Sequence, residues 1–163
     1  MTDRDQFLIV NSRGGNGQNP NVLGLVDDNS GGVRPQLAVS TDGTIPKELD
    51  AVFWTRQPFA DGWGWTIQTS YKDTNYHLSV SSWSSGVLCE LTDVPWAIWR
   101  FTYSNRILTY DAATGIPYSL DTGQYPDVMI WDFVSSVNQT WGFAPYVSNN
   151  ALLGEPPEVS LLS

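Results

Sequence analysis

Short runs of hydrophobic residues, some alternating with polar ones, follow one another along the chain and are separated by polar turn residues. Such runs predict β-strands, here over residues 6–12, 21–26, 34–40, 51–57, 65–71, 77–83, 86–92, 97–103, 106–112, 116–122, 127–133 and 139–146. Turn dipeptides lie between many of them, including Asp-Gly at 42–43, Ser-Gly at 85–86 and Thr-Gly at 114–115. No stretch of helix length shows a 3.6-residue hydrophobic period. The pattern therefore predicts an all-β protein.

The predicted strands fall into three groups of four, and the fourth strand of each group carries a tryptophan. These are Trp54, Trp99 and Trp141, separated by 45 and 42 residues. A regular period of this length indicates repeated supersecondary units. Three four-stranded units are too few for a closed propeller, so we predict a β-trefoil with pseudo-threefold symmetry. An ordinary β-sandwich with accidental spacing remains the alternative.

This interpretation gives one domain over residues 1–146, with repeats at about 5–58, 59–103 and 104–146. Residues 147–163 form a C-terminal extension outside the repeats. In each repeat the recurring tryptophan is expected to be a core residue.

Charge and composition exclude several classes of partner. The chain of 163 residues has a net charge of −9, and its eight Lys and Arg residues are not clustered. Nucleic acids and anionic membranes are therefore not expected partners. No apolar run approaches the length of a membrane span. Cys89 is the one cysteine and the first residues lack an apolar signal region, so we expect a cytoplasmic protein without disulfides.

The residues that carry catalysis in many enzymes are scarce. His77 is the one histidine, and no Ser-His-Asp set, Cys-His set or metal-ligand spacing surrounds it. Most carboxylates lie in turns, where they bond to the backbone. The sequence therefore predicts a binding protein without enzymatic activity, cofactor or metal.

Two tryptophans lie in polar settings that suit carbohydrate binding. A flat aromatic ring can cover the C–H face of a sugar, while polar groups bond its hydroxyls. Trp83 lies between serines beside a glycine turn, and Trp96 follows Pro95 with Asp93 nearby. A ring that covers the edge of the barrel is the alternative role for both tryptophans. Trp63, between glycines, is expected to be exposed. Trp131, which alternates with Ile130, is expected to pack, with a second binding site in the third repeat as the alternative.

The chain resembles the small fungal fruiting-body β-trefoil proteins, which include ricin-B-like lectins and mycocypin-type protease inhibitors. The resemblance covers roughly residues 5–146 and consists of strands and tryptophans. The Gln-x-Trp triplet of ricin-B lectins is missing, and its nearest equivalent is Asn138-Gln139-Thr140-Trp141. This difference argues against the ordinary galactose site.

A lectin subgroup that also lacks the full Gln-x-Trp set is more similar. The similarity lies in four segments: Trp65-Thr66-Ile67, Trp83-Ser84-Ser85-Gly86-Val87, the pair Trp96 and Trp99, and Ser119-Leu120-Asp121-Thr122. Members bind N-acetylglucosamine-containing glycans, including fucosylated chitobiose cores. The resemblance implies sugar-facing positions at Trp83, Trp96 and Trp99, with Phe59 at the edge, and a defensive role. The repeat spacing, by contrast, assigns Trp99 to the core.

The alternative from the same resemblance is a protease inhibitor that acts through exposed loops. Gly14 and Gly15 are similar to the loop that binds papain-like proteases, and Asn75 to the residue presented to legumain. Arg34 could enter a trypsin-like pocket, although Pro35 follows it directly. Turn formation explains all three segments equally well. We prefer a lectin, because loop inhibition does not require Trp83 and Trp96, whereas glycan stacking does.

Overall fold

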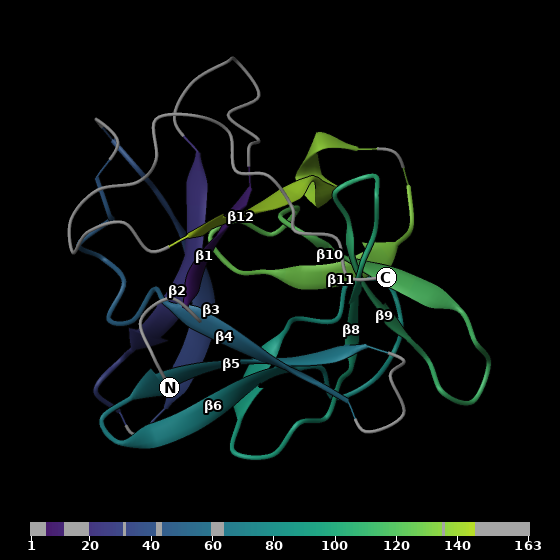
Figure 1. Cartoon of the computed structure of the whole chain (residues 1–163), viewed down its shortest axis with the longest axis horizontal. Coiled ribbons are helices and arrows are strands. Elements are labelled where there is room, and N and C mark those ends of the chain that lie inside the picture. The colour runs from purple at the N-terminus through teal and green to yellow at the C-terminus, as the bar shows by residue number, and fades with distance from the viewer. Residues whose placement is uncertain are drawn as a thin grey trace.

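The computed structural model describes residues 6–11, 20–30, 32–41, 44–59, 64–134 and 136–145. Twelve strands are present (Figure 1): β1 (Phe7–Asn11), β2 (Asn21–Asp27), β3 (Val33–Val39), β4 (Trp54–Pro58), β5 (Trp65–Tyr71), β6 (Thr74–Ser79), β7 (Glu90–Thr92), β8 (Trp99–Phe101), β9 (Ile107–Tyr110), β10 (Pro117–Asp121), β11 (Met129–Asp132) and β12 (Trp141–Pro145). A 3-10 helix at Val137–Gln139 is the one helical turn among the described residues. The prediction of an all-β protein is confirmed.

All strand pairs are antiparallel, and together they form one strongly curled sheet (Figure 1). One series of neighbours runs β12, β1, β4, β5, β8 and β9. The backbone N–H of Trp141 at the start of β12 donates to the carbonyl oxygen of Asn105, just before β9, at 2.8 Å. This hydrogen bond joins the two ends of the series. The pairs β2–β3, β6–β7 and β10–β11 extend from it.

The core contains the three tryptophans that recur along the sequence. Trp54, Trp99 and Trp141 lie in β4, β8 and β12, and all three are buried. Each indole Nε1 donates to a backbone carbonyl oxygen of the strand that lies two strands earlier in the chain. The acceptors are Leu23 in β2 at 2.8 Å, Leu78 in β6 at 2.9 Å and Leu120 in β10 at 2.9 Å. The predicted burial of these three rings is confirmed.

Segments from all three strand groups also meet away from these tryptophans. Gln36 of β3 forms a β-bridge with Asp127, and Leu88 forms one with Met129. The backbone N–H of Cys89 donates to the carbonyl oxygen of Val128 at 2.9 Å. These contacts connect the regions around β3, β7 and β11, which lie far apart in the sequence.

The sixth strand differs most from its prediction. It begins at Thr74 and not at residue 77, because Lys72 and Asp73 have φ values of 50° and 63° and form a two-residue hairpin turn. A type I′ hairpin turn requires positive φ at both central residues. Such φ values are unusual for residues other than glycine. The strand ends at Ser79, so Trp83 lies in the following loop and not in the strand.

Some predictions fall outside the described residues. These are the structures of Gly14 and Gly15, Trp63 and the C-terminal extension 147–163. The search for membrane-spanning helices found none in the described part of the chain.

Candidate functional site

The loop from Asp93 to Trp96 connects β7 with β8 and is held onto β6 by a series of hydrogen bonds. The backbone N–H of Trp96 donates to Ser79 Oγ at 3.2 Å. Ser79 Oγ lies 2.7 Å from Thr92 Oγ1, whose own hydroxyl donates to the carbonyl oxygen of Val94. Either hydroxyl can be the donor in the Ser79–Thr92 pair, since each also has a carbonyl acceptor, His77 for Ser79 and Val94 for Thr92. These hydrogen bonds connect Val94 and Trp96 of the loop with Ser79 and Thr92, and they fix the position of the Trp96 backbone.

The Trp96 ring is the large exposed element of this loop. Its side chain is 62% exposed, whereas Ala97, which follows it, is buried in the core. Pro95 precedes the ring and restricts the backbone. A large, exposed aromatic ring on a restrained backbone is a typical feature of a binding site.

Polar residues occur in the same loop and in the strand to which it is bonded. Asp93, which is exposed, belongs to the same loop, and His77 pairs with Thr92 across β6 and β7. Burial lowers the pKa of His77 from 6.5, and the nearby Asp93 carboxylate opposes this shift. His77 is therefore neutral at pH 7, with one donor and one acceptor nitrogen. Its Nδ1 is buried and has no hydrogen-bond partner among the described atoms.

Trp83 is turned toward the interior. Its Nε1 lies 3.3 Å from Thr109 Oγ1 of β9, to which it donates, and its half-buried ring packs against the core. The loop around it is held against β11, since Gly86 N–H donates to the Ile130 carbonyl at 2.8 Å. Trp83 thus offers only part of its ring to a ligand.

Trp131 is more exposed than the sequence suggested. Ile130 is fully buried and Trp131 is 40% exposed. The ring approaches Gly86, where an added Cβ would lie 3.5 Å from Trp131 Cζ3. The packing predicted for Trp131 is therefore partial.

Trp99 and Phe59 are not brought together with Trp96. Trp99 has no exposed surface, so its implied sugar-facing role is wrong and the core role derived from the repeat spacing holds. Phe59 is 41% exposed, and its N–H donates to Gly64 just before β5. Trp65 pairs with Trp99 in antiparallel register, so the residues before Trp65 lie alongside those after Trp99, such as Arg100. Trp96 precedes Trp99 and therefore lies on the other side of this pair. Phe59 is therefore not beside the Trp96 loop.

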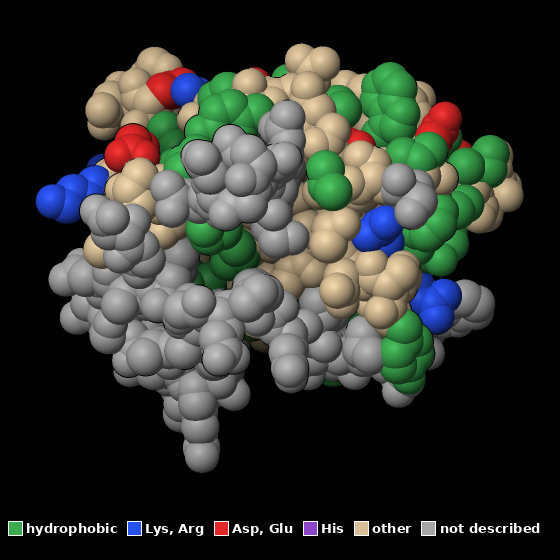
Figure 2. Space-filling view, turned by 90° about the horizontal axis from the view of Figure 1, so that it is seen from above, with side chains coloured by type: hydrophobic (Ala, Val, Ile, Leu, Met, Phe, Trp, Pro, Cys, Tyr) green, Lys and Arg blue, Asp and Glu red, His purple; other side chains and the backbone are tan. Residues whose placement is uncertain are grey.

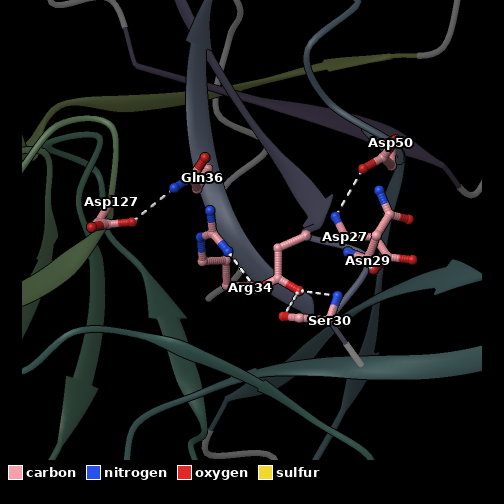
Figure 3. Close-up of polar contacts among 8 residues, drawn as sticks. Asp27, Asn29, Ser30, Arg34, Gln36, Asp50 and Asp127 are labelled. Carbon is pink, nitrogen blue, oxygen red and sulfur yellow. Dashed lines mark hydrogen bonds and ion pairs between the residues drawn. The ribbon is translucent and has the colours of Figure 1, made fainter. Parts of the chain in front are cut away.

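Arg34, one of the candidate inhibitory residues, lies within a paired strand. It faces Val26 in the β2–β3 ladder, and its Nη1 is 3.1 Å from Asp28 Oδ2 (Figure 3). Pro35 is buried. An inhibitor inserts an unpaired, substrate-like segment into a protease, so this position argues against Arg34 as an anchor residue.

The Asp28 carboxylate that holds Arg34 belongs to a turn built from side chain to backbone contacts. Ser30 donates to Asp28 Oδ1 through its hydroxyl at 2.6 Å and through its N–H at 2.9 Å (Figure 3). These hydrogen bonds, led by the hydroxyl, lower the pKa of Asp28. The turn-forming role expected for Asp27 and Asp28 is consistent with this geometry.

Asn75 is exposed and lies near the tip of the β5–β6 hairpin. It pairs with Ser70, two positions after the Lys72–Asp73 turn. Like Arg34, Asn75 therefore lies in a paired strand near the tip of a hairpin.

The surface has few features that attract an anionic polymer or a metal. On the face in Figure 2, basic side chains are scattered among hydrophobic and uncharged ones. Among the described residues no three His, Cys, Asp or Glu side chains are grouped to hold a metal ion.

Comparison with known proteins does not name a relative. No protein-family model matches the chain, and the searches of the curated proteins and of the solved structures found no match.

Proposed function

We propose that this protein is a lectin that binds N-acetylglucosamine-containing glycans, fucosylated ones among them, at the Trp96 loop. The observation that carries the proposal is the 62% exposed Trp96 ring on a backbone held by Ser79. An aromatic ring that is already ordered loses little conformational entropy when a sugar stacks on it.

In this proposal each group of the loop has one role. The Trp96 ring covers the C–H face of a sugar, and the Asp93 carboxylate accepts hydrogen bonds from its hydroxyls. Ser79 acts as a positioning residue, because it contacts the loop backbone from a fully buried place in β6. Trp83 contributes the exposed part of its ring at most.

We propose further that the fold is a β-trefoil with three four-stranded repeats. Three pairs of strands, β4 with β2, β8 with β6 and β12 with β10, are joined by the same indole-to-carbonyl hydrogen bond. The series of neighbours from β12 to β9, joined by the Trp141–Asn105 bond, supports a six-stranded barrel. The meeting of the β3, β7 and β11 regions supports a hairpin cap.

A glycan array with the labelled full chain tests the lectin proposal, followed by titration calorimetry with the best glycan. Trp96→Ala should weaken binding about 30-fold or more, as is usual when about 2 kcal/mol is lost at an aromatic hot spot. Trp131→Ala is the matched control, because it also removes an exposed tryptophan, and it should bind normally. Near-UV circular dichroism verifies that both variants are folded. Full glycan affinity in Trp96→Ala would contradict the proposed site.

Protease inhibition through Asn75 is the second candidate. Its support is the exposed position of Asn75 near a tight hairpin turn. A legumain inhibition assay, with Asn75→Ala as the comparison, tests it. Inhibition that disappears in the variant, together with a blank glycan array, would favour the inhibitor.

A further inference from the structure

A pocket of about 550 Å³ lies between the chain segment 45–53 and the strands β4, β5 and β6. Its volume is in the range typical of small-molecule sites, about 300–1,000 Å³. The segment 45–53 supplies an apolar wall, which includes Leu49, Val52 and Phe53. The strands supply a second wall of a different character.

The second wall consists of uncharged polar side chains on one face of the sheet. Thr55 pairs with Gln68 across β4 and β5, and Ser70 pairs with Asn75 across β5 and β6. Directly paired residues, and residues two apart in a strand, point to the same face. All four side chains line the pocket, and thus form a continuous row of hydroxyl and amide groups.

Gln68 is the part of this row that lacks a partner. Its side chain is 1% exposed. Thr66 Oγ1 donates to Gln68 Oε1 at 3.0 Å, which leaves the other end of the amide, Nε2, as a donor. Nε2 is buried and has no hydrogen-bond partner among the described residues. A buried donor without an acceptor is costly, and a bound ligand is one way to satisfy it.

The charges in the pocket limit the classes of ligand that it can bind. Among the described residues of the lining, Asp50 is the one that carries a charge, and none is a Lys or Arg that could neutralise an anion. An uncharged ligand with a hydrogen-bond acceptor, further hydroxyl groups and an apolar side fits both walls. An N-acetylated sugar has these features, since its acetamido carbonyl is an acceptor and its methyl group and C–H face are apolar.

We propose that this pocket binds a single N-acetylated sugar residue, with Gln68 Nε2 donating to the acetamido oxygen. Ser70 and Asn75, which are exposed near the β5–β6 turn, bond its hydroxyls, and the methyl group lies against Leu49 and Val52. The ligand proposed for the pocket belongs to the same class as the ligand of the proposed function. The pocket, however, is lined by none of the residues of the Trp96 loop. A chain with both sites could bind a branched or clustered glycan more tightly than either site alone.

The test is an NMR titration of the full ¹⁵N-labelled chain with N-acetylglucosamine. The side-chain amide signals of Gln68 should shift with saturation, along with the backbone signals of Thr55 and Asn75. The same shifts should occur in Trp96→Ala, whose own loop no longer responds. Unchanged Gln68 signals up to high millimolar sugar would overturn the proposed pocket, whatever the result at Trp96.

Variants separate binding from folding. Gln68→Met removes the donor and should weaken this site about tenfold, the effect of one hydrogen bond. Gln124→Met makes the same change in an exposed turn and should leave it unaltered. If Gln68→Met does not fold, Ser70→Ala combined with Asn75→Ala gives the answer, because both residues are exposed. Unaltered affinity in a folded pocket variant would refute the assignment.

Discussion

The indole Nε1 of Trp99 donates to the backbone carbonyl oxygen of Leu78 at 2.9 Å inside the core. The residues are 21 positions apart, as are Trp141 and Leu120, which make the same contact. Each indole therefore fills space in the core and also donates a hydrogen bond to the backbone of another strand.

Replacement of any of these three tryptophans by phenylalanine should destabilise the fold. Each change leaves a buried carbonyl without its donor and opens a small cavity, and we expect a loss of about 2–4 kcal/mol in the free energy of unfolding. Trp131→Phe is the control and should change it by less than about 0.5 kcal/mol. Urea unfolding followed by circular dichroism measures both. Equal stability of Trp99→Phe and Trp131→Phe would show that the indole contacts do not matter.

The stability of the protein should depend on pH through His77. Burial lowers the pKa of His77 below 6.5, so the unfolded state binds the proton more tightly than the folded state. The free energy of unfolding should therefore fall as the pH is lowered through 6.5 toward the depressed pKa of the native state. Urea unfolding between pH 7.5 and 5.5 measures this slope.

His77→Gln is the control for that experiment. His77 is the one histidine of the chain, so no other side chain has an ordinary pKa inside this window. The variant should lose most of the slope. An identical slope in both proteins would mean that His77 is not the group responsible.

Cys89 should be unreactive in the native protein. Its side chain is buried, and burial raises the pKa of the thiol well above its usual range. The thiolate is the reactive form, so a disulfide reagent at pH 8 should label the native chain slowly and the urea-unfolded chain at once. Rapid labelling without urea would show that the region between β6 and β7 opens readily.

Gly64→Ala should be destabilising by about 1–3 kcal/mol, the usual effect of overpacking. An added Cβ would lie 2.6 Å from the carbonyl oxygen of Trp99 and 2.8 Å from Ile98 Cγ2, where the start of β5 meets β8. Gly32→Ala is the control, because its Cβ would have no neighbour closer than 3.9 Å. Thermal unfolding of the two variants compares them, and a Gly64→Ala melting temperature equal to that of Gly32→Ala would contradict the close packing.

The local pattern of hydrophobic and polar residues predicted that the chain forms strands. It did not predict where each strand begins and ends. Alternation identified β5 over residues 65–71 as it is found. It placed the next strand late, because Lys72 and Asp73 adopt the left-handed conformation without the glycine that usually marks such turns. The side chains of Lys72 and Asp73 do not by themselves indicate that the backbone adopts this conformation.

The candidate site was recognised in part. Trp96 was identified from its polar neighbours, and it is exposed. Trp83 has similar neighbours in the sequence, yet Thr109 from another strand group draws its indole inward. The sequence did not indicate a role for Gln68, because uncharged polar residues are common in strands. That its Nε2 lacks a hydrogen-bond partner among the described residues is visible only in the three-dimensional structure.

Three features follow from the sequence by itself: the all-β class, the burial of Trp54, Trp99 and Trp141, and the net charge of −9. Strand periodicity, residue spacing and composition are local properties, and they remain valid however the strands are arranged. The tertiary structure alone decided which tryptophans face outward and which polar groups meet in a pocket. Those outcomes depend on contacts between segments far apart in the chain, such as Thr55 with Gln68 and Ser79 with Trp96, and sequence spacing does not encode their geometry.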